Sequence, residues 1–198
     1  MKKLFVAILA LAFLAGCSSE PSKPATADKP APKAPEALTG TSAFYKCYIA
    51  ARGWAQDAQP FRLESQASAD SKGREGKALS WRAGFASPAQ HSTKPYTWLN
   101  GEVSPGVEDT YSPTNSSTTV FNIQFLKTDT DKALEAAQKH GGDKLLEKEP
   151  DTPILYLLDW NRQTNELTWH VIYGTDRDSA KLRVAVNAST GEFLRVEK

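Results

Sequence analysis

This sequence of 198 residues has few cysteines, few long apolar runs and almost no excess of either charge. One uninterrupted apolar run, Leu4 to Leu14, opens the chain, and it is shorter than the roughly 20 residues that a membrane-spanning helix needs. The chain has 24 basic and 23 acidic residues, and without Lys2 and Lys3 the basic count falls to 22. Such a balance offers no basic stripe to nucleic acid and no polybasic patch to a membrane.

The common catalytic and metal-binding motifs are also missing. The sequence has no Gly-x-Ser-x-Gly elbow, no phosphate-binding loop and no His-Glu-x-x-His pair. The three histidines, His91, His140 and His170, are far apart, with none at the i, i+4 spacing of a helical metal pair. We therefore predict no enzyme activity, no metal and no cofactor. A catalytic pair of acidic residues remains an open alternative, because two acids that are far apart in the sequence can meet in the folded protein.

The apolar run has the parts of an export signal in their usual order. Lys2 and Lys3 precede it, and it ends in Leu14-Ala15-Gly16-Cys17. This ending resembles the bacterial lipoprotein box, which implies cleavage between Gly16 and Cys17 and a lipid on Cys17. A transmembrane anchor is disfavoured by the shortness of the run, and an ordinary signal peptide with an incidental cysteine is the remaining alternative.

A lipidated Cys17 places the protein in the cell envelope, bound to the membrane through its lipid and facing the periplasm or the exterior. Ser18 and Ser19 replace the aspartate that resembles an inner-membrane retention signal, so the outer membrane is preferred for a Gram-negative cell. The other cysteine, Cys47, has no partner left in the chain and lies among apolar residues. We predict that it is a buried, unreactive thiol.

Residues 1–16 are thus a lipoprotein signal peptide, and residues 17–40 are the lipidated cysteine followed by a disordered tether. The tether is rich in proline and alanine, and Leu38 is its only large apolar residue. Such a segment buries too little apolar surface to offset the entropy of ordering it. Extended at about 3.1 Å per residue, it would act as a spacer of up to roughly 70 Å.

From Thr41 onward the apolar spacing predicts an α+β fold made of two tandem units, 41–127 and 128–198. In each unit we expect one helix packed on a small antiparallel sheet. The first helix runs to about Ala58 and is stopped by Pro60, and the second starts at a Thr128 cap and ends at Gly141-Gly142. The expected strands are 78–87, 96–99 and 120–126 in the first unit, and 154–160, 166–173, 181–187 and 192–196 in the second.

A weak internal repeat supports two units. Leu79-Ser80-Trp81 matches Leu167-Thr168-Trp169 at an offset of 88 residues, and the same offset superposes a helix on a helix and a strand on a strand. We favour a duplication, and the alternative is a chance match between two amphipathic strands.

The second unit resembles the PepSY family. The resemblance rests on the alanine-rich 131–137 followed by Gly141-Gly142, on the strand 167–173, and on 184–192 with its Asn187 and Thr190-Gly191-Glu192 turn. The first unit fits only loosely, because it lacks that turn. The resemblance implies a non-catalytic binding or inhibitory module of the envelope, and it transfers no catalytic residues.

The five tryptophans are expected to fill two small cores. The alternative is that some of them, together with tyrosines, form an exposed platform for a ligand; Tyr96, Trp98 and Tyr111 are the candidate binding aromatics. We expect a non-catalytic envelope lipoprotein that binds a protein partner, a peptidase or a peptide segment, through an open sheet edge or the loop 101–119. The alternatives are a glycan-binding or peptidoglycan-binding module and, third, an envelope enzyme.

Overall fold

The computed structural model describes residues 36–197 and has an α+β fold. The expected fold class is thus confirmed at this level. The signal peptide, Gly16, Cys17 and nearly all of the expected tether lie outside the described residues.

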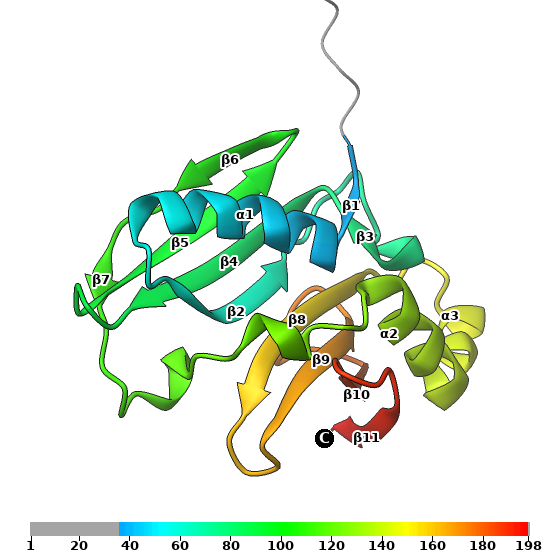
Figure 1. Ribbon diagram of the computed structural model, residues 1–198. Coiled ribbons are helices and arrows are strands. Elements are labelled where there is room, and N and C mark those ends of the chain that lie inside the picture. The colour runs from blue at the N-terminus through cyan, green and yellow to red at the C-terminus, as the bar shows by residue number, and fades with distance from the viewer. Residues whose placement is uncertain (1–35, 198) are drawn as a thin grey trace, which may run out of the picture. The chain divides into compact units, whose positions relative to one another are not determined.

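A nine-stranded antiparallel sheet forms the centre of the described part of the chain (Figure 1). Its strands lie in the order β11-β10-β9-β8-β2-β4-β5-β6, with β7 paired beside β5. Residues 59–105 and 154–197 each form a meander, and the two meanders join where β2 pairs with β8. The strands are β2 Gln59–Ser65, β4 Ser80–Ser87, β5 Ser92–Leu99, β6 Glu102–Pro105, β7 Asp109–Thr110, β8 Ile154–Asn161, β9 Glu166–Tyr173, β10 Leu182–Asn187 and β11 Phe193–Glu197; β1 Leu38–Thr39 and β3 Lys77–Ala78 form a separate pair.

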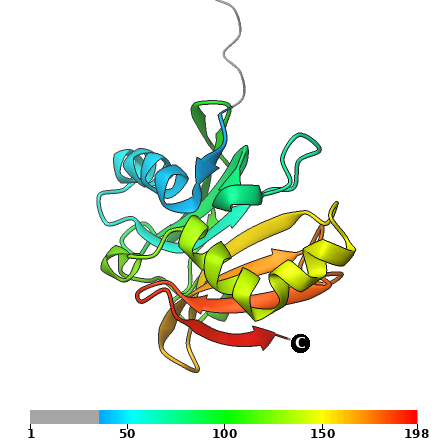
Figure 2. The same cartoon turned by 90° about the vertical axis from the view of Figure 1, so that its right-hand side faces the viewer.

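The α-helices all pack on one face of this sheet. Helix α1 (Gly40–Trp54) lies over β2, β4 and β5, and α2 (Thr130–Ala137) lies over β9 and β10. Figure 2 shows α2 and α3 (Asp143–Lys148) across the half formed by β8 to β11. The face beneath the helices is called the helix-facing face below, and the opposite one the helix-free face.

The strand register assigns each side chain to one of these faces, because successive side chains alternate. Trp81 pairs with Trp98, and Leu63 lies between Ala83 and Leu158 on the helix-facing face. The buried side chains of this face belong to one continuous cluster that includes residues of both meanders. The expectation of two small separate cores is therefore wrong, since the β2–β8 pairing merges them.

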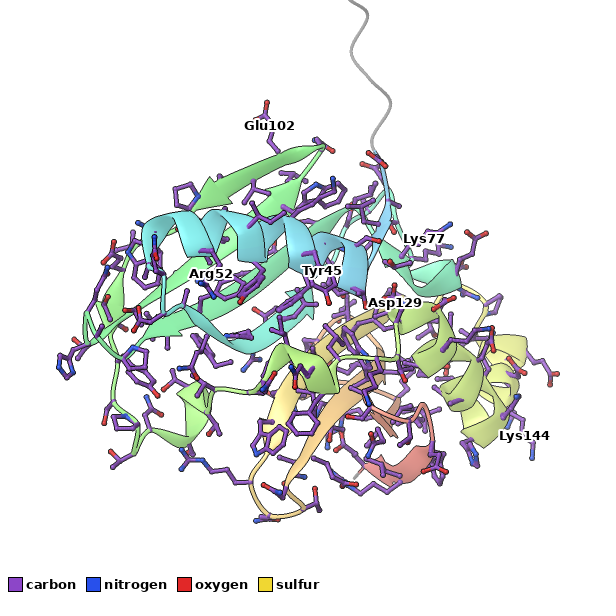
Figure 3. The ribbon with its side chains drawn as sticks, viewed as in Figure 1. Tyr45, Arg52, Lys77, Glu102, Asp129 and Lys144 are labelled. Carbon is purple, nitrogen blue, oxygen red and sulfur yellow. The ribbon has the colours of Figure 1, made fainter. Side chains whose placement is uncertain are left out.

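Helices α1 and α2 begin side by side, and their first residues share hydrogen bonds. Asp129 caps α2 by accepting from the Thr130 N–H, and its Oδ1 also accepts from the Thr41 N–H of α1 at 2.9 Å. The Gly40 N–H donates to Thr130 Oγ1, which in turn donates to the Gly76 carbonyl. Figure 3 shows Asp129 at this junction. The predicted Thr128 cap is wrong by one residue, because Asp129 has the oxygen that reaches the free N–H groups.

Several predicted elements need correction. Residues 120–126 form no strand; they contain the 3-10 turn η3 (Ile123–Phe125), which begins with the Asn122 side chain accepting from the Gln124 N–H. Gly141-Gly142 does not end the second helix. A π-type turn, η4 (Gln138–Gly142), passes through Gly141 at φ +114° and leads into α3. The alternation of apolar residues in 120–126 reflects packing of Phe121 and Leu126 on the core rather than ladder pairing.

Helix α1 ends at Trp54, before it reaches Pro60, so the expectation that Pro60 stops it is wrong; Pro60 instead belongs to β2, a strand that the sequence did not predict. The register between β2 and β4 shifts between Pro60 and Arg62, so Phe61 is an extra, bulged residue. Its ring lies over Gly84 of β4, where an added Cβ would be 2.4 Å from Phe61 Cζ. Gly84, which has no side chain, provides the space for this ring.

Candidate functional site

A hollow of about 510 Å³ lies on the helix-free face. Strands β2, β4 and β5 form its floor, and residues of the segment 107–118 form its wall. That segment belongs to the loop 101–119, which the sequence had marked as a docking element. The lining residues are Phe61, Arg62, Glu64, Arg82, Gly84, Thr93, Pro95, Val107, Glu108, Asp109 and Thr118.

Apolar groups occupy the middle of the hollow. The ring of the bulged Phe61 lies over Gly84, and Pro95 pairs with Gly84 from β5. Val107, at the rim, is 89% exposed, more than any other large hydrophobic side chain among the described residues. An apolar side chain of a partner would contact all three groups and displace water from them.

The charges at the rim are only partly paired. Arg62 Nε donates to Glu64 Oε2 at 2.8 Å, and Lys94 Nζ donates to Glu108 Oε1 at 2.9 Å. Arg82 is exposed and makes no ion pair or hydrogen bond with any residue that the structure describes. Its cross-strand neighbour Glu64 is held by Arg62. The hollow therefore presents one guanidinium group that is free to bind a carboxylate in the bidentate geometry typical of arginine.

A second polar cluster lies further along the same face. His170 of β9 is 4% exposed and is held between two acids. Its Nδ1 lies 2.8 Å from Glu197 Oε2 of β11, and its Nε2 lies 3.1 Å from Asp159 Oδ1 of β8. Glu197 also accepts from Arg195 at 3.0 Å. This cluster connects three strands through side chains and adds to their backbone ladders.

The two acids determine the charge of the ring. Burial alone would lower the pKa of His170, but the hydrogen bonds and charges of Asp159 and Glu197 outweigh it and raise that pKa above its usual value. Burial would likewise raise the pKa of both carboxyl groups, yet the contact with His170 holds the pKa of each below its usual range. A protonated ring that donates to both acids has no free nitrogen with which to act as a general base.

The acids of this cluster lie on opposite sides of the imidazole and do not converge on one point. Within residues 36–197, no group of three or more histidine, cysteine, aspartate or glutamate side chains is placed to hold a metal ion. His91 and His140 lie apart from the cluster: His91 is in the turn between β4 and β5, and His140 stacks on Phe193 at 3.6 Å between ring centroids. Nothing in the sequence indicated that Asp159 and Glu197 meet the His170 ring.

The three candidate binding aromatics are buried. Trp98 is fully buried on the helix-facing face, and Tyr96 and Tyr111 are exposed by only 5% and 8%. Trp98 packs beneath α1, and the Tyr96 ring lies 6.0 Å from that of Phe85. These rings therefore form part of the core and offer no open platform to a sugar.

Cys47 lies on the buried side of α1, where its thiol donates to the Tyr96 carbonyl at 3.8 Å. Burial raises the pKa of Cys47 to about 12. We therefore expect native protein at pH 8 to react with iodoacetamide about 10³-fold more slowly than a free cysteine, because very little thiolate forms. Mass spectrometry of native and urea-unfolded samples measures this rate. Equal labelling of both samples would contradict the burial of Cys47.

Comparison with known proteins bears on the start of the chain. A family model for the prokaryotic membrane lipoprotein lipid attachment site matches residues 1–18, which include Gly16 and Cys17. Neither the curated proteins nor the solved structures give a match. The chain is thus a bacterial lipoprotein, held at the cell envelope by lipid on its cysteine. Between residues 36 and 197, no helix is long and apolar enough to cross a membrane.

Proposed function

We propose that this lipoprotein is a non-catalytic binding module of two tandem PepSY-like units. The support for two units is a tryptophan hydrogen bond that occurs once in each of them. The Trp81 indole donates to the Leu38 carbonyl at 2.9 Å, and the Trp169 indole donates to the Thr128 carbonyl at 2.8 Å. Each acceptor precedes the first residue of an α-helix by two positions, and each tryptophan lies on the second strand of its meander. A duplication explains this match more simply than chance does.

The turn after β10 supports the PepSY likeness of the second unit. Asn187 Oδ1 accepts from the N–H groups of Ser189 and Thr190, and the Gly191 N–H donates to the Asn187 carbonyl. Gly191 has φ +79°, a conformation that glycine adopts without strain. Asn187 and Gly191 thus stabilise the shape of this turn. This structural role fits a family whose motif carries no catalytic residue.

The proposed activity is the capture of an envelope protein, either a peptidase or an exposed peptide segment, in the hollow on the helix-free face. The observation that carries this proposal is the unpaired Arg82 beside Phe61, Pro95 and Val107. A partner segment that places a carboxylate next to an apolar side chain would satisfy both features at once. The glycan-binding alternative lacks support because its aromatics are buried. Outer-membrane residence stays part of the proposal and rests on Ser18 and Ser19.

Photo-crosslinking in intact envelopes tests this proposal. A photoreactive amino acid replaces Thr97, which lies beside Arg82 on the neighbouring strand, and captured proteins are identified by mass spectrometry. We expect Arg82→Glu to lower the yield of the captured protein about tenfold or more, because a like charge then faces the partner's carboxylate. Arg82→Lys should retain part of the yield, since it keeps the charge and loses the bidentate geometry.

Lys144→Glu is the matched control, because it reverses an exposed charge on α3, well away from the hollow (Figure 3). It should leave the yield unchanged. Equal yields for all three variants would overturn the proposal. Recovery of peptidoglycan fragments without any protein would also overturn it, and would favour the glycan-binding alternative.

A further inference from the structure

The outward face of α1 exposes apolar and basic side chains together. Tyr45 is 43% exposed and Ile49 is 73% exposed, one helical turn further along. Lys46 and Arg52 are also exposed and lie on the same face, because positions three or four apart are neighbours on a helix. Figure 3 labels Tyr45 and Arg52 along this helix. These four residues are called the α1 surface below.

The α1 surface carries no negative charge of its own. Helix α1 contains no aspartate or glutamate along its 15 residues. The acid that follows it, Asp57, accepts hydrogen bonds from the Ser87 hydroxyl and the Ala89 N–H, and Arg52 is close enough to help lower the pKa of Asp57. Lys46 and Arg52 can therefore meet anionic groups from outside with little competition from this helix.

The segment beside α1 also lacks negative charge. A groove of about 390 Å³ separates Tyr48 and Arg52 from Val120 and Ile123. Residues 120–123 form the far side of this groove, and the longer segment 111–126 to which they belong contains no charged side chain. Phe125 of this segment is 45% exposed. Exposed aromatic and aliphatic groups flanked by lysine and arginine are typical of helices that lie in the headgroup region of a membrane.

We propose that the α1 surface rests on the anionic lipid surface to which the protein is anchored. Gly40, the first residue of α1, follows Cys17 by 23 positions, so the anchor keeps it within about 80 Å of the lipid even with the chain fully extended. A contact that is too weak to hold a free protein becomes intramolecular in a tethered one, because the tether sets an effective concentration of the lipid surface around α1. Two apolar side chains and two cations then add to the binding that the lipid anchor already supplies.

This contact would also orient the sheet. Helix α1 and the hollow lie on opposite faces of β2, β4 and β5. With α1 against the lipid, the helix-free face and Arg82 point away from the membrane. The inference does not depend on the proposed partner, since a lipid contact at α1 can exist whether or not the hollow binds a protein.

Depth-dependent fluorescence quenching tests the inference with the lipidated mature protein in vesicles of phosphatidylethanolamine and phosphatidylglycerol. An environment-sensitive thiol dye is attached after Ile49→Cys, and in a matched variant after Val107→Cys; the buried Cys47 stays unlabelled. Both positions are exposed and apolar, and they lie on opposite sides of the sheet. We expect a lipid-borne quencher to quench the dye at position 49 at least about threefold more than the dye at position 107.

The charge arm of the experiment uses Lys46→Glu combined with Arg52→Glu in the dye-labelled protein. We expect this reversal to remove most of the extra quenching at position 49, and Lys144→Glu to leave it unchanged. Equal quenching at positions 49 and 107 would overturn the inference. A change in the environment of the dye at position 49 that requires added envelope proteins would overturn the inference as well. The α1 surface would then be covered by a protein and not by the lipid surface.

Discussion

Replacing Trp169 by phenylalanine should lower the free energy of unfolding by about 2–4 kcal/mol, and Trp81→Phe should lower it by a similar amount. Both indoles are fully buried, and each donates its N–H to the carbonyl that precedes an α-helix. The smaller ring would leave a cavity and an unpaired carbonyl. Both rings also pack on Gly40, where an added Cβ would be 2.7 Å from Trp169 and 3.2 Å from Trp81. Either change therefore loosens the junction of the two helices.

Urea denaturation followed by circular dichroism measures these effects. Trp54→Phe is the control, because Trp54 is only half-buried at the end of α1 and should cost less than about 1 kcal/mol. Similar losses at Trp81 and Trp169 are expected if the two positions are structurally equivalent. A loss at one tryptophan only would contradict that equivalence, and with it the support for a duplication.

The strands of the second meander could be predicted from the sequence because their apolar residues alternate. Leu167, Trp169 and Val171 face the helices, and the structure places β9 at Glu166–Tyr173 as expected. The first helix was also predicted, although α1 ends at Trp54 rather than near Ala58. Local signals were sufficient here, since burial of one face imposes a period of two on a strand and of about 3.6 on a helix.

The features that were missed depend on contacts between distant parts of the chain. β2 contains Pro60 and a bulge at Phe61, and both weaken the alternation that identifies a strand. Its pairing with β8 joins residues about 95 positions apart, and this pairing replaces two expected cores with one. Such register is specified by packing that a local pattern does not contain.

The candidate site shows the same division. The loop 101–119 could be singled out from its turn-forming residues, and the structure uses part of it as the wall of the hollow. The unpaired state of Arg82 could not be predicted, because it depends on Arg62 engaging Glu64 from within β2. The candidate aromatics failed for a related reason. Tyr96 and Trp98 alternate with polar residues along β5, and this alternation is the same whichever face of the strand is buried. Only the position of α1 decides that the face with the aromatic side chains is covered.

Replacing His170 by phenylalanine should lower the free energy of unfolding by about 2–4 kcal/mol at pH 6, since it leaves Asp159 and Glu197 facing a buried apolar ring. Glu197 would keep Arg195, whereas Asp159 would lose its closest hydrogen-bond partner. Strand β11 lies at the edge of the sheet and holds Glu197, so its backbone amides should exchange with deuterium faster in the variant.

The pH dependence of this loss identifies its electrostatic origin. The pKa of His170 is raised by folding, so its contribution is complete below about pH 6.5 and disappears as the pH rises through the folded-state value. The pKa values of Asp159 and Glu197 are lowered, so their contributions are present above about pH 4.5 and disappear as the pH falls through their folded-state values.

The difference in the free energy of unfolding between wild type and His170→Phe should therefore be largest between about pH 5 and 6.5, and should shrink on both sides. Urea titrations from pH 4 to 9 measure it. His91→Asn, at an exposed turn with φ +52°, is the matched control, since it replaces a histidine that lies outside the cluster. A loss at His170 that did not vary with pH would mean that the ring acts through packing alone, and that the two carboxylates do not hold it in its charged form.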